Sequence, residues 1–243
     1  MLTLINLDTA HERRERMAEQ LDALGVPYTR VGIDLRRTSD AAIEAWLARH
    51  LPGIGFDRNE LSGAEIGCWV SHVTAWRCLA ASDAHAATVV EDDLLLRPEF
   101  ADTVGVLQTQ SPFDVVFLGT SSRNISTRRH TMIGSLRAHA PVGAIYNTWG
   151  YTIARGYVLR FFAQPRTIAT PIDHWLGGRS RVLKPRIGVV RPAVVAENPA
   201  LGLDSQIEPH TMRLDRWKIV EGTRRAVLAS RFSDLYYSLY RFL

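Results

Sequence analysis

Three consecutive acids, Glu91, Asp92 and Asp93, are the residues in this sequence that most clearly suggest chemistry. The apolar run 88–90 precedes them and is typical of a buried strand, so the acids fall at the strand's carboxyl end, where open α/β sheets place their ligands. Adjacent carboxylates repel one another, which costs stability unless a cation lies there. A divalent metal ion, which prefers oxygen ligands and is often completed by phosphate oxygens, fits this arrangement. The alternative is a solvated acidic turn.

The segments that must position these acids predict an α/β domain. Residues 2–7, 9–24 and 28–33 have the patterns of a strand, a helix and a strand, and this order is a βαβ unit with parallel strands. Asn6 and Asp34 therefore lie at strand ends, on the edge where the acids fall. No glycine-rich loop follows the first strand, so the dinucleotide fingerprint and the P-loop are both absent.

A buried helix is predicted from residue 62 onward. Ser62 and Glu65 have capping-box spacing at its start. Its apolar residues fall on two faces, which indicates a helix packed beside the acidic strand end. Cys68 and His72 are four residues apart in this helix, but no second ligand pair accompanies them, so no zinc site is expected.

The composition indicates an ordinary globular protein, with 46% hydrophobic and 22% charged residues in a chain of 243. The net charge of +4 lies wholly in residues 212–243, so the main body has no broad basic face for nucleic acid. No uncharged apolar run reaches roughly 18 residues, so no spanning helix is expected. The apolar stretch at the N-terminus is too short for a signal peptide, because polar residues follow it early. Cys68 and Cys78 are about 15 Å apart along one predicted helix, which is too far for a disulfide bond. These features predict a cytoplasmic protein with reduced cysteines.

The later part of the chain continues the pattern. Residues 114–119 and 146–154 are predicted strands, and the polar, basic stretch 120–134 is predicted to be a long loop. Pro171 suits the first turn of a short helix that carries Asp173.

Five blocks of the sequence stand out in order along the chain. They are Leu4-Ile5-Asn6-Leu7-Asp8 with Arg13-Arg14-Glu15-Arg16-Met17, then Leu61-Ser62-Gly63-Ala64-Glu65-Ile66-Gly67-Cys68-Trp69-Val70-Ser71-His72, Val90-Glu91-Asp92-Asp93, Thr148-Trp149-Gly150-Tyr151-Thr152-Ile153 with Pro171-Ile172-Asp173, and Asp204-Ser205-Gln206-Ile207. Together they resemble glycosyltransferase family 25, which includes bacterial lipooligosaccharide galactosyltransferases and relatives of collagen galactosyltransferases. Two departures lie where the family often has glycine: Leu35, after Asp34, and Asn147.

The resemblance implies a GT-A-type, Rossmann-like and mostly parallel sheet flanked by helices over residues 1–211, followed by a basic helical tail over 212–243. It also implies an inverting transfer of a hexose, galactose from UDP-galactose, to a bacterial lipooligosaccharide or lipopolysaccharide precursor. Mn²⁺ or Mg²⁺ would neutralise the leaving diphosphate. The rival functions are a non-catalytic module that binds a glycan or nucleotide, and a nucleotidyltransferase, which would need the phosphate loop that is missing.

Metal contact is assigned first to Asp93 and second to Glu91, because residues two apart in an extended segment point the same way. His210 could complete the metal shell from a later loop. Asp92 would point elsewhere; it is a candidate for binding the nucleotide-sugar, with indirect support of the metal ligands or backbone capping as its alternative. Asp173 is the candidate base for the acceptor hydroxyl, with helix capping as its alternative and His174 as its rival.

Six further residues match the family's motifs and are candidates for binding the nucleotide-sugar. Each has a structural alternative: a solvated charge, a turn cap, a helix cap or a buried hydrogen-bonded pair. They are Asn6, Arg13, Asp34, Glu65, Ser71 and His72.

Basic and aromatic residues alternate along the tail, residues 212–243. Such a segment suits the anionic surface of the inner face of a membrane, where a glycolipid acceptor would lie. The alternative is a helix packed on the catalytic domain or on a second subunit.

Overall fold

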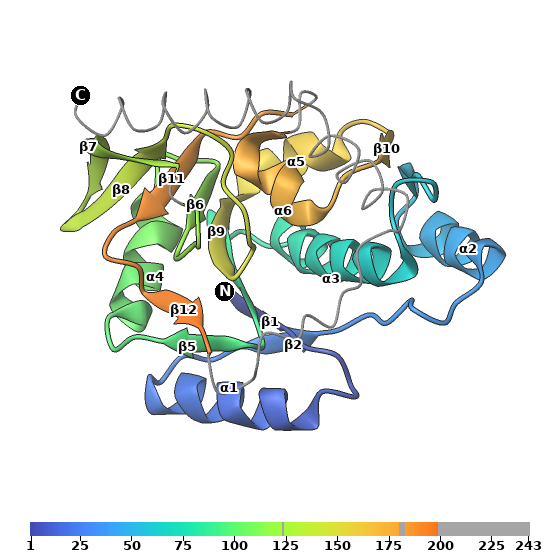
Figure 1. Ribbon diagram of the computed structural model, residues 1–243, viewed down its shortest axis with the longest axis horizontal. Coiled ribbons are helices and arrows are strands. Elements are labelled where there is room, and N and C mark those ends of the chain that lie inside the picture. Colours follow the sequence, from blue (N-terminus) through green and yellow to red (C-terminus); the bar gives the residue numbers. More distant parts are fainter. Residues whose placement is uncertain (123, 180–182, 199–243) are drawn as a thin grey trace, which may run out of the picture.

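The computed structural model describes residues 1–122, 124–179 and 183–198. Within these ranges a mixed sheet of eight strands, in the order β2-β1-β4-β9-β6-β11-β8-β7, is flanked by helices (Figure 1). The strands of this sheet are β1 (Leu2–Ile5), β2 (Thr29–Val31), β4 (Ala86–Glu91), β6 (Val115–Phe117), β7 (Ile125–Ile133), β8 (Leu136–Pro141), β9 (Gly150–Ala154) and β11 (Ile187–Val190). The predicted tail, residues 212–243, lies outside the described residues.

Smaller elements complete the described fold. Two-stranded sheets pair β3 (Ile54–Phe56) with β10 (Arg166–Ile168), and β5 (Leu94–Leu96) with β12 (Val195–Glu197). The helices are α1 (His11–Ala23), α2 (Asp40–His50), α3 (Gly63–Ala80), α4 (Phe100–Gln110), α5 (Arg155–Phe162) and α6 (Ile172–His174), the last continuing as a π-helix over Trp175–Arg179. None of the helices described here combines the length and the apolarity that crossing a membrane requires.

The start of the chain is the predicted βαβ unit. Strand β1 is parallel to β2 on one side and to β4 on the other, so the carboxyl ends of all three meet at one edge. The prediction of a mostly parallel sheet is wrong, because the sheet is mixed. Strand β11 is parallel to β6, but β9 runs antiparallel to β4 and β6, and β8 runs antiparallel to β11 and β7. A buried apolar run predicts a strand but carries no information on its direction.

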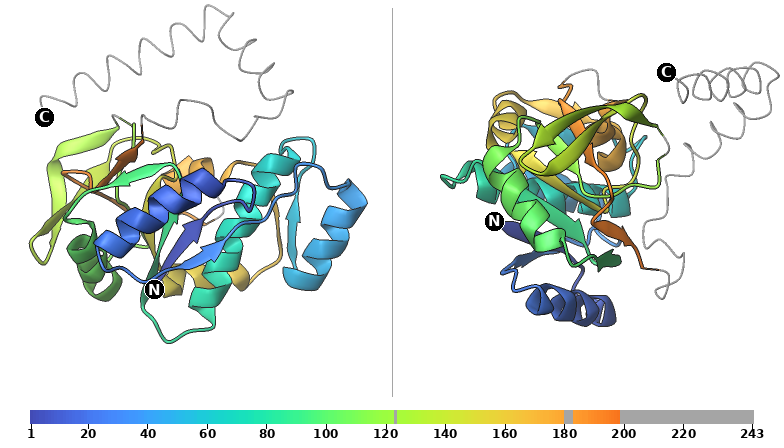
Figure 2. Two further views of the ribbon diagram at one scale, coloured as in Figure 1. Left: turned by 90° about the horizontal axis from the view of Figure 1, so that it is seen from below. Right: turned by 90° about the vertical axis from the view of Figure 1, so that its left-hand side faces the viewer.

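Hydrophobic cores lie on both faces of the sheet, as the alternation of side chains along each strand requires. On one face Val89 and Phe117 pack with residues of α3 and α5. On the other, Val90 and Leu118 pack with residues of α1 and α4. Figure 2 shows α1 and α5 lying on opposite sides of the strands. The acidic segment therefore follows directly after a strand, β4, that is packed against helices on both faces of the sheet.

Helix α3 is the predicted buried helix, and its capping box is confirmed. Ser62 Oγ accepts a hydrogen bond from the backbone N–H of Glu65, while Glu65 Oε2 accepts one from the backbone N–H of Ser62. Gly67 lets the helix approach the chain that follows β2, because a Cβ at this position would come within 2.7 Å of the carbonyl oxygen of Ile33. This close packing fixes α3 against the sheet's carboxyl edge.

The stretch predicted to be a loop, residues 120–134, is a strand over most of its length. Strands β7 and β8 form a hairpin at the edge of the sheet, and Gly134 takes a positive φ of 58° in the turn. Most of β7 is exposed, so its sequence lacks the apolar alternation by which a half-buried strand is recognised.

Candidate functional site

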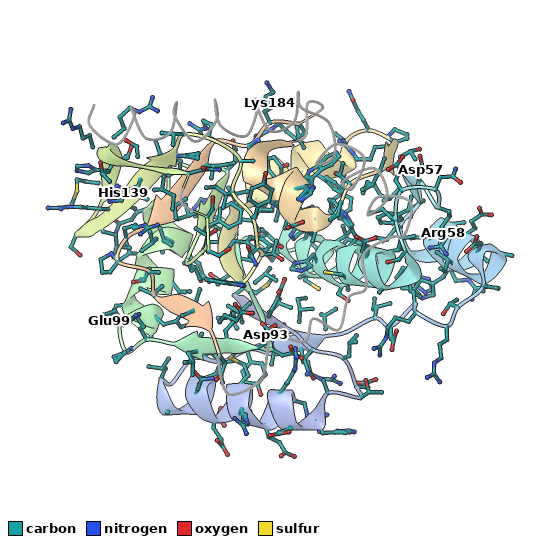
Figure 3. All side chains as sticks on the ribbon, in the orientation of Figure 1. Asp57, Arg58, Asp93, Glu99, His139 and Lys184 are labelled. Atoms are coloured by element: carbon teal, nitrogen blue, oxygen red, sulfur yellow. The ribbon has the colours of Figure 1, made fainter. Side chains whose placement is uncertain are left out.

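The acidic residues form a tight turn at the carboxyl edge of the sheet. Glu91 is the last residue of β4, and Asp92 and Asp93 turn the chain into β5. The segment is therefore not extended, and the premise that Glu91 and Asp93 point the same way by strand geometry is wrong. Figure 3 labels Asp93 near these strand ends, above α1 in that view.

Arg13 of α1 lies against the two aspartates. Its Nη1 atom is 3.4 Å from Asp92 Oδ1 and 3.5 Å from Asp93 Oδ2. Asn6, after β1, donates from Nδ2 to Asp92 Oδ2 at 2.7 Å and to the carbonyl oxygen of Ala10 at 3.0 Å. Asp92 is thus held by two neighbours, and its orientation relative to a metal stays a prediction. The contacts of Asn6 and Arg13 are with this turn, and contact of either with a nucleotide stays a prediction.

Asp93 is the least compensated of the three acids. Burial, followed by the negative charges of Glu91 and Asp92, raises its pKa to about 7, although Arg13 acts in the opposite direction. Its Oδ1 atom is buried and has no hydrogen-bond partner among the described residues. Burial also raises the pKa of Asp92, against the hydrogen bond from Asn6 and the charge of Arg13. A cation beside Asp93 would relieve both the repulsion and the missing partner.

Glu91 faces helix α3 and the chain before β9. Thr148 Oγ1 donates a hydrogen bond to Glu91 Oε1, and His72 Nε2 lies 3.6 Å from the same oxygen. Burial raises the pKa of Glu91, but the interactions with His72 and Thr148 and the charge of Arg13 outweigh burial, so the net pKa is below the ordinary value. Glu91 is therefore ionised at neutral pH.

A buried hydrogen-bonded chain leads from His72 into the core. His72 Nδ1 is 2.8 Å from the Tyr151 hydroxyl, which also accepts a hydrogen bond from Trp76 Nε1 at 3.0 Å. Cys68, one turn before His72, lies close enough that its sulfur, a ring nitrogen of His72 and a carboxylate oxygen of Glu91 are all within 4.8 Å of one another. Sequence reasoning missed this cluster, because the third member comes from a strand rather than from a second pair on a helix.

Asp173 occupies the first turn of α6. Its Oδ1 atom accepts a hydrogen bond from the backbone N–H of His174 at 2.8 Å, whereas the N-cap position is Pro171 and has no side-chain cap hydrogen bond. The neighbouring His174 packs edge-on against Tyr146, with ring centroids 5.4 Å apart. Asp173 nevertheless belongs to the same electrostatic environment as the acidic turn: burial, then the charges of Glu91, Asp173 and Glu65, raise the pKa of Cys68 well above its ordinary value.

Asp34 and its surroundings form the outer rim of this edge. The hydrogen bond from the Arg36 side chain lowers the pKa of Asp34, and Asp34 Oδ1 also accepts from the backbone N–H of Arg36 at 3.0 Å. Arg30, which sequence reasoning did not single out, donates to the carbonyl oxygen of Asn6 at 3.1 Å and to Asp8 at 2.6 Å. The sequence feature that could have identified Arg30 is its position on a predicted strand, next to another predicted strand that ends in polar residues.

Glu65 and Ser71 have structural partners in α3. Glu65 completes the capping box, and Ser71 Oγ accepts from the backbone N–H of Ile33 at 2.9 Å while donating to the carbonyl oxygen of Gly67 at 2.8 Å. A role for either in donor binding stays a prediction. His210 and the block 204–207 lie outside the described residues.

Asn147, where the resemblance leads one to expect glycine, has a φ of 69°. Asparagine tolerates this left-handed conformation better than most residues. Its Oδ1 atom accepts a hydrogen bond from Ser121 Oγ at 2.8 Å. Asparagine can therefore take the positive φ that the backbone has before Thr148.

Fold and site together define an α/β protein with a carboxylate cluster at the carboxyl edge of its sheet. The chain belongs to glycosyltransferase family 25: the family model described as "Glycosyltransferase family 25 (LPS biosynthesis protein)" matches residues 2–176.

Curated relatives agree with this assignment at low identity. A "Glycosyltransferase 25 family member" of Anopheles gambiae is 27% identical over 181 residues, covering 71% of this chain and 30% of the relative. "Procollagen galactosyltransferase 1" of Danio rerio is 26% identical over 184 residues, again covering 71% and 30%. The match thus spans less than a third of the length of these relatives.

Solved structures resemble the chain only distantly. Mannose-1-phosphate geranyltransferase from Thermus thermophilus aligns with a TM-score of 0.37 and 15% identity, covering 78% of this chain and 72% of that one. HddC from Yersinia pseudotuberculosis aligns with a TM-score of 0.37 and 11% identity, covering 82% and 94%. At these scores the likenesses carry no argument about function.

Proposed function

We propose that this protein is an inverting, metal-dependent glycosyltransferase of GT-A type that transfers galactose from UDP-galactose to a glycan acceptor, a bacterial lipooligosaccharide or lipopolysaccharide precursor. Family membership and the galactosyltransferases among the relatives support the donor. The observation in this chain that carries the proposal is the acidic turn at the sheet's carboxyl edge, where Asp93 keeps a buried oxygen without a partner among the described residues.

The residues of the turn fit a hard divalent cation. Carboxylate oxygens are the ligands that Mn²⁺ and Mg²⁺ prefer. Burial and, after it, the negative charges of Glu91 and Asp92 raise the pKa of Asp93, and a cation would offset both effects. In the proposal Asp93 is the first contact and Glu91 the second, with His210 as a third. When bound, the cation would stabilise the charge that develops on the leaving diphosphate.

The chain's own residues would position the donor and accept the proton. Asn6 and Arg13 hold Asp92 and so fix the turn, while Arg13 adds positive charge beside the expected diphosphate. Asp173 would take the proton of the acceptor hydroxyl, because its hydrogen bond to His174 engages Oδ1 alone. Asp34, Glu65 and Ser71 would shape the donor pocket in addition to their structural contacts.

A thermal-shift screen of UDP-sugars with and without Mn²⁺ tests donor binding, since a ligand that binds the native state raises the apparent stability. UDP-galactose should raise Tm only with the metal. Asp93→Ala should abolish this shift, and Asp83→Asn, a change of an acid before the other end of β4, should keep it. A wild-type shift in Asp93→Ala would refute the metal assignment.

Transfer needs a separate measurement, because a non-catalytic module of the same fold would also bind UDP-galactose. Galactose incorporation into a lipooligosaccharide acceptor, followed by mass spectrometry, distinguishes the two functions. Binding without incorporation into any acceptor glycan tested would favour the binding module.

We also propose that the protein acts at the cytoplasmic face of a membrane through residues 212–243, which lie outside the described residues. The seven basic residues of this stretch and its aromatics support attraction to anionic lipid. Co-sedimentation with anionic liposomes should be lost when residues 212–243 are deleted. Unchanged sedimentation would reject this part of the proposal.

A further inference from the structure

A second group of potential ligands lies beside the acidic turn and includes a sulfur. Cys68 and His72 are one turn apart on α3, so their side chains lie on the same face of the helix. Glu91, at the end of β4, completes the group, and one ligand atom from each residue lies within 4.8 Å of the others. His72 is fully buried, while Cys68 and Glu91 are partly buried, so the group lies at the inner end of the acidic edge.

The position of His72 indicates that an ion can bind between its imidazole ring and the carboxylate of Glu91. Its Nε2 atom is buried and has no hydrogen-bond partner among the described residues. The 3.6 Å separation from Glu91 Oε1 is longer than a hydrogen bond, for which about 2.7–3.2 Å is usual. It is, however, close to the spacing of two ligands around one tetrahedral ion whose bonds are about 2.0–2.2 Å long.

We propose that Cys68 Sγ, His72 Nε2 and a carboxylate oxygen of Glu91 bind a zinc ion, with the proton of the Cys68 thiol released to solvent as the sulfur–zinc bond forms. A thiolate, an imidazole and a carboxylate are the donor types that zinc accepts, whereas Mg²⁺ and Mn²⁺ favour oxygen alone. Three protein ligands leave a fourth position open for water or a substrate group, as in catalytic zinc sites. The ion would tie the end of β4 to α3. Glu91 would then bind zinc instead of the cation of the proposed nucleotide-sugar, and Asp93 would remain as the contact for that cation.

The partners of His72 allow this site and provide a direct readout. An indole N–H only donates, so the Tyr151 oxygen accepts from Trp76, and its own proton is available for His72 Nδ1. In the proposed metal-free state Tyr151 donates to Nδ1, which places the imidazole proton on Nε2. Binding of zinc through Nε2 requires the proton on Nδ1, which then donates to Tyr151, the usual arrangement around a metal-bound histidine. Binding of zinc should therefore move the imidazole proton of His72 from Nε2 to Nδ1.

The test uses the full-length protein, stripped of metal and titrated with Co²⁺ as a spectroscopic substitute for zinc. One Co²⁺ should bind per chain and produce a thiolate-to-cobalt charge-transfer band in the near ultraviolet. Cys68→Ser should remove this band and weaken binding at least about 100-fold, since loss of outer partners alone costs about 10- to 100-fold. Cys78→Ser, which changes the exposed cysteine of the same helix, should leave both unchanged.

Further variants separate the site from folding defects and from the proposed transfer reaction. Tyr151→Phe keeps all three ligands, so it should retain the band and bind Co²⁺ about 10- to 100-fold more weakly. Imidazole ¹⁵N NMR should show His72 changing tautomer when Zn²⁺ is added. Asp93→Asn should keep the cobalt band even though it loses Mn²⁺-dependent binding of UDP-galactose. Absence of the band in the wild type, its persistence in Cys68→Ser, or its loss in Cys78→Ser would each overturn the proposal.

Discussion

Replacing Asp93 by asparagine in the metal-free protein should stabilise it at pH 8. The pKa of Asp93 is raised from 3.8 to about 7 in the folded protein, so the native state binds a proton more tightly than the unfolded chain does. The wild type therefore loses stability as the pH rises from about 4 to about 7, and above that the full cost is present. Asparagine, which carries no charge, does not incur this cost.

The magnitude follows from the size of the shift. About three pKa units correspond to about 4 kcal/mol at most, because each unit is worth about 1.4 kcal/mol. Since 32% of the Asp93 side chain is exposed, solvent screening lowers the expected effect to about 1–2 kcal/mol. Most of this amount, relative to the wild type, should be gained by Asp93→Asn between pH 5 and pH 8, because the effect develops from about pH 4 to about pH 7.

Urea denaturation in the presence of a chelator, repeated across this pH range, measures the difference between the two proteins. Taking the difference removes the contributions of other titrating groups, and Asp83→Asn, at an acid away from the turn, should follow the wild type at every pH. Mn²⁺ should stabilise the wild type at pH 8 and have little effect on Asp93→Asn. If the unfolding free energies of wild type and Asp93→Asn run parallel from pH 5 to pH 8, the electrostatic account of the turn is wrong.

Three further predictions concern the elements that hold the site. Gly67→Ala should lower the urea midpoint by the equivalent of about 1–3 kcal/mol, because the new Cβ meets the carbonyl oxygen of Ile33, and an unchanged midpoint would show that α3 can move away. Tyr151→Phe should cost about 1–3 kcal/mol in the same assay, since it leaves the indole N–H of Trp76 without its buried acceptor, and a neutral effect would contradict that hydrogen bond. Asp173→Asn should keep UDP-galactose binding and lower transfer about 10²- to 10⁴-fold, and wild-type turnover would return Asp173 to a capping role.

Much of the site's framework could be predicted because local rules set it. The βαβ start follows from the order of apolar runs, and the α3 cap follows from the spacing of Ser62 and Glu65. The position of Glu91 at a strand end follows from three apolar residues running into acids. These features depend on neighbours in the sequence, which is what periodicity and capping patterns describe.

The features that sequence reasoning missed depend on contacts between distant segments. Strand β9 enters the sheet antiparallel between β4 and β6, a choice set by the whole topology rather than by its own residues. Strand β7 of the β7–β8 hairpin is mostly exposed and polar, so its sequence lacks the alternation of apolar and polar residues by which a strand is recognised. The approach of Glu91 to His72 joins residues 19 positions apart through the packing of α3 on β4.

The cap of α3 has a consequence for how a diphosphate can be held. The amino end of a helix carries partial positive charge and free N–H groups, and many proteins use such an end to bind phosphate. Here the carboxylate of Glu65 already lies at that end and accepts from the N–H of Ser62, while the Glu65 N–H is used by the Ser62 hydroxyl. The dipole of this 18-residue helix is thus neutralised from within the chain. In the proposed reaction, a diphosphate at this end would meet the negative charge of Glu65, so Arg13 and the proposed cation would have to balance the diphosphate charge instead.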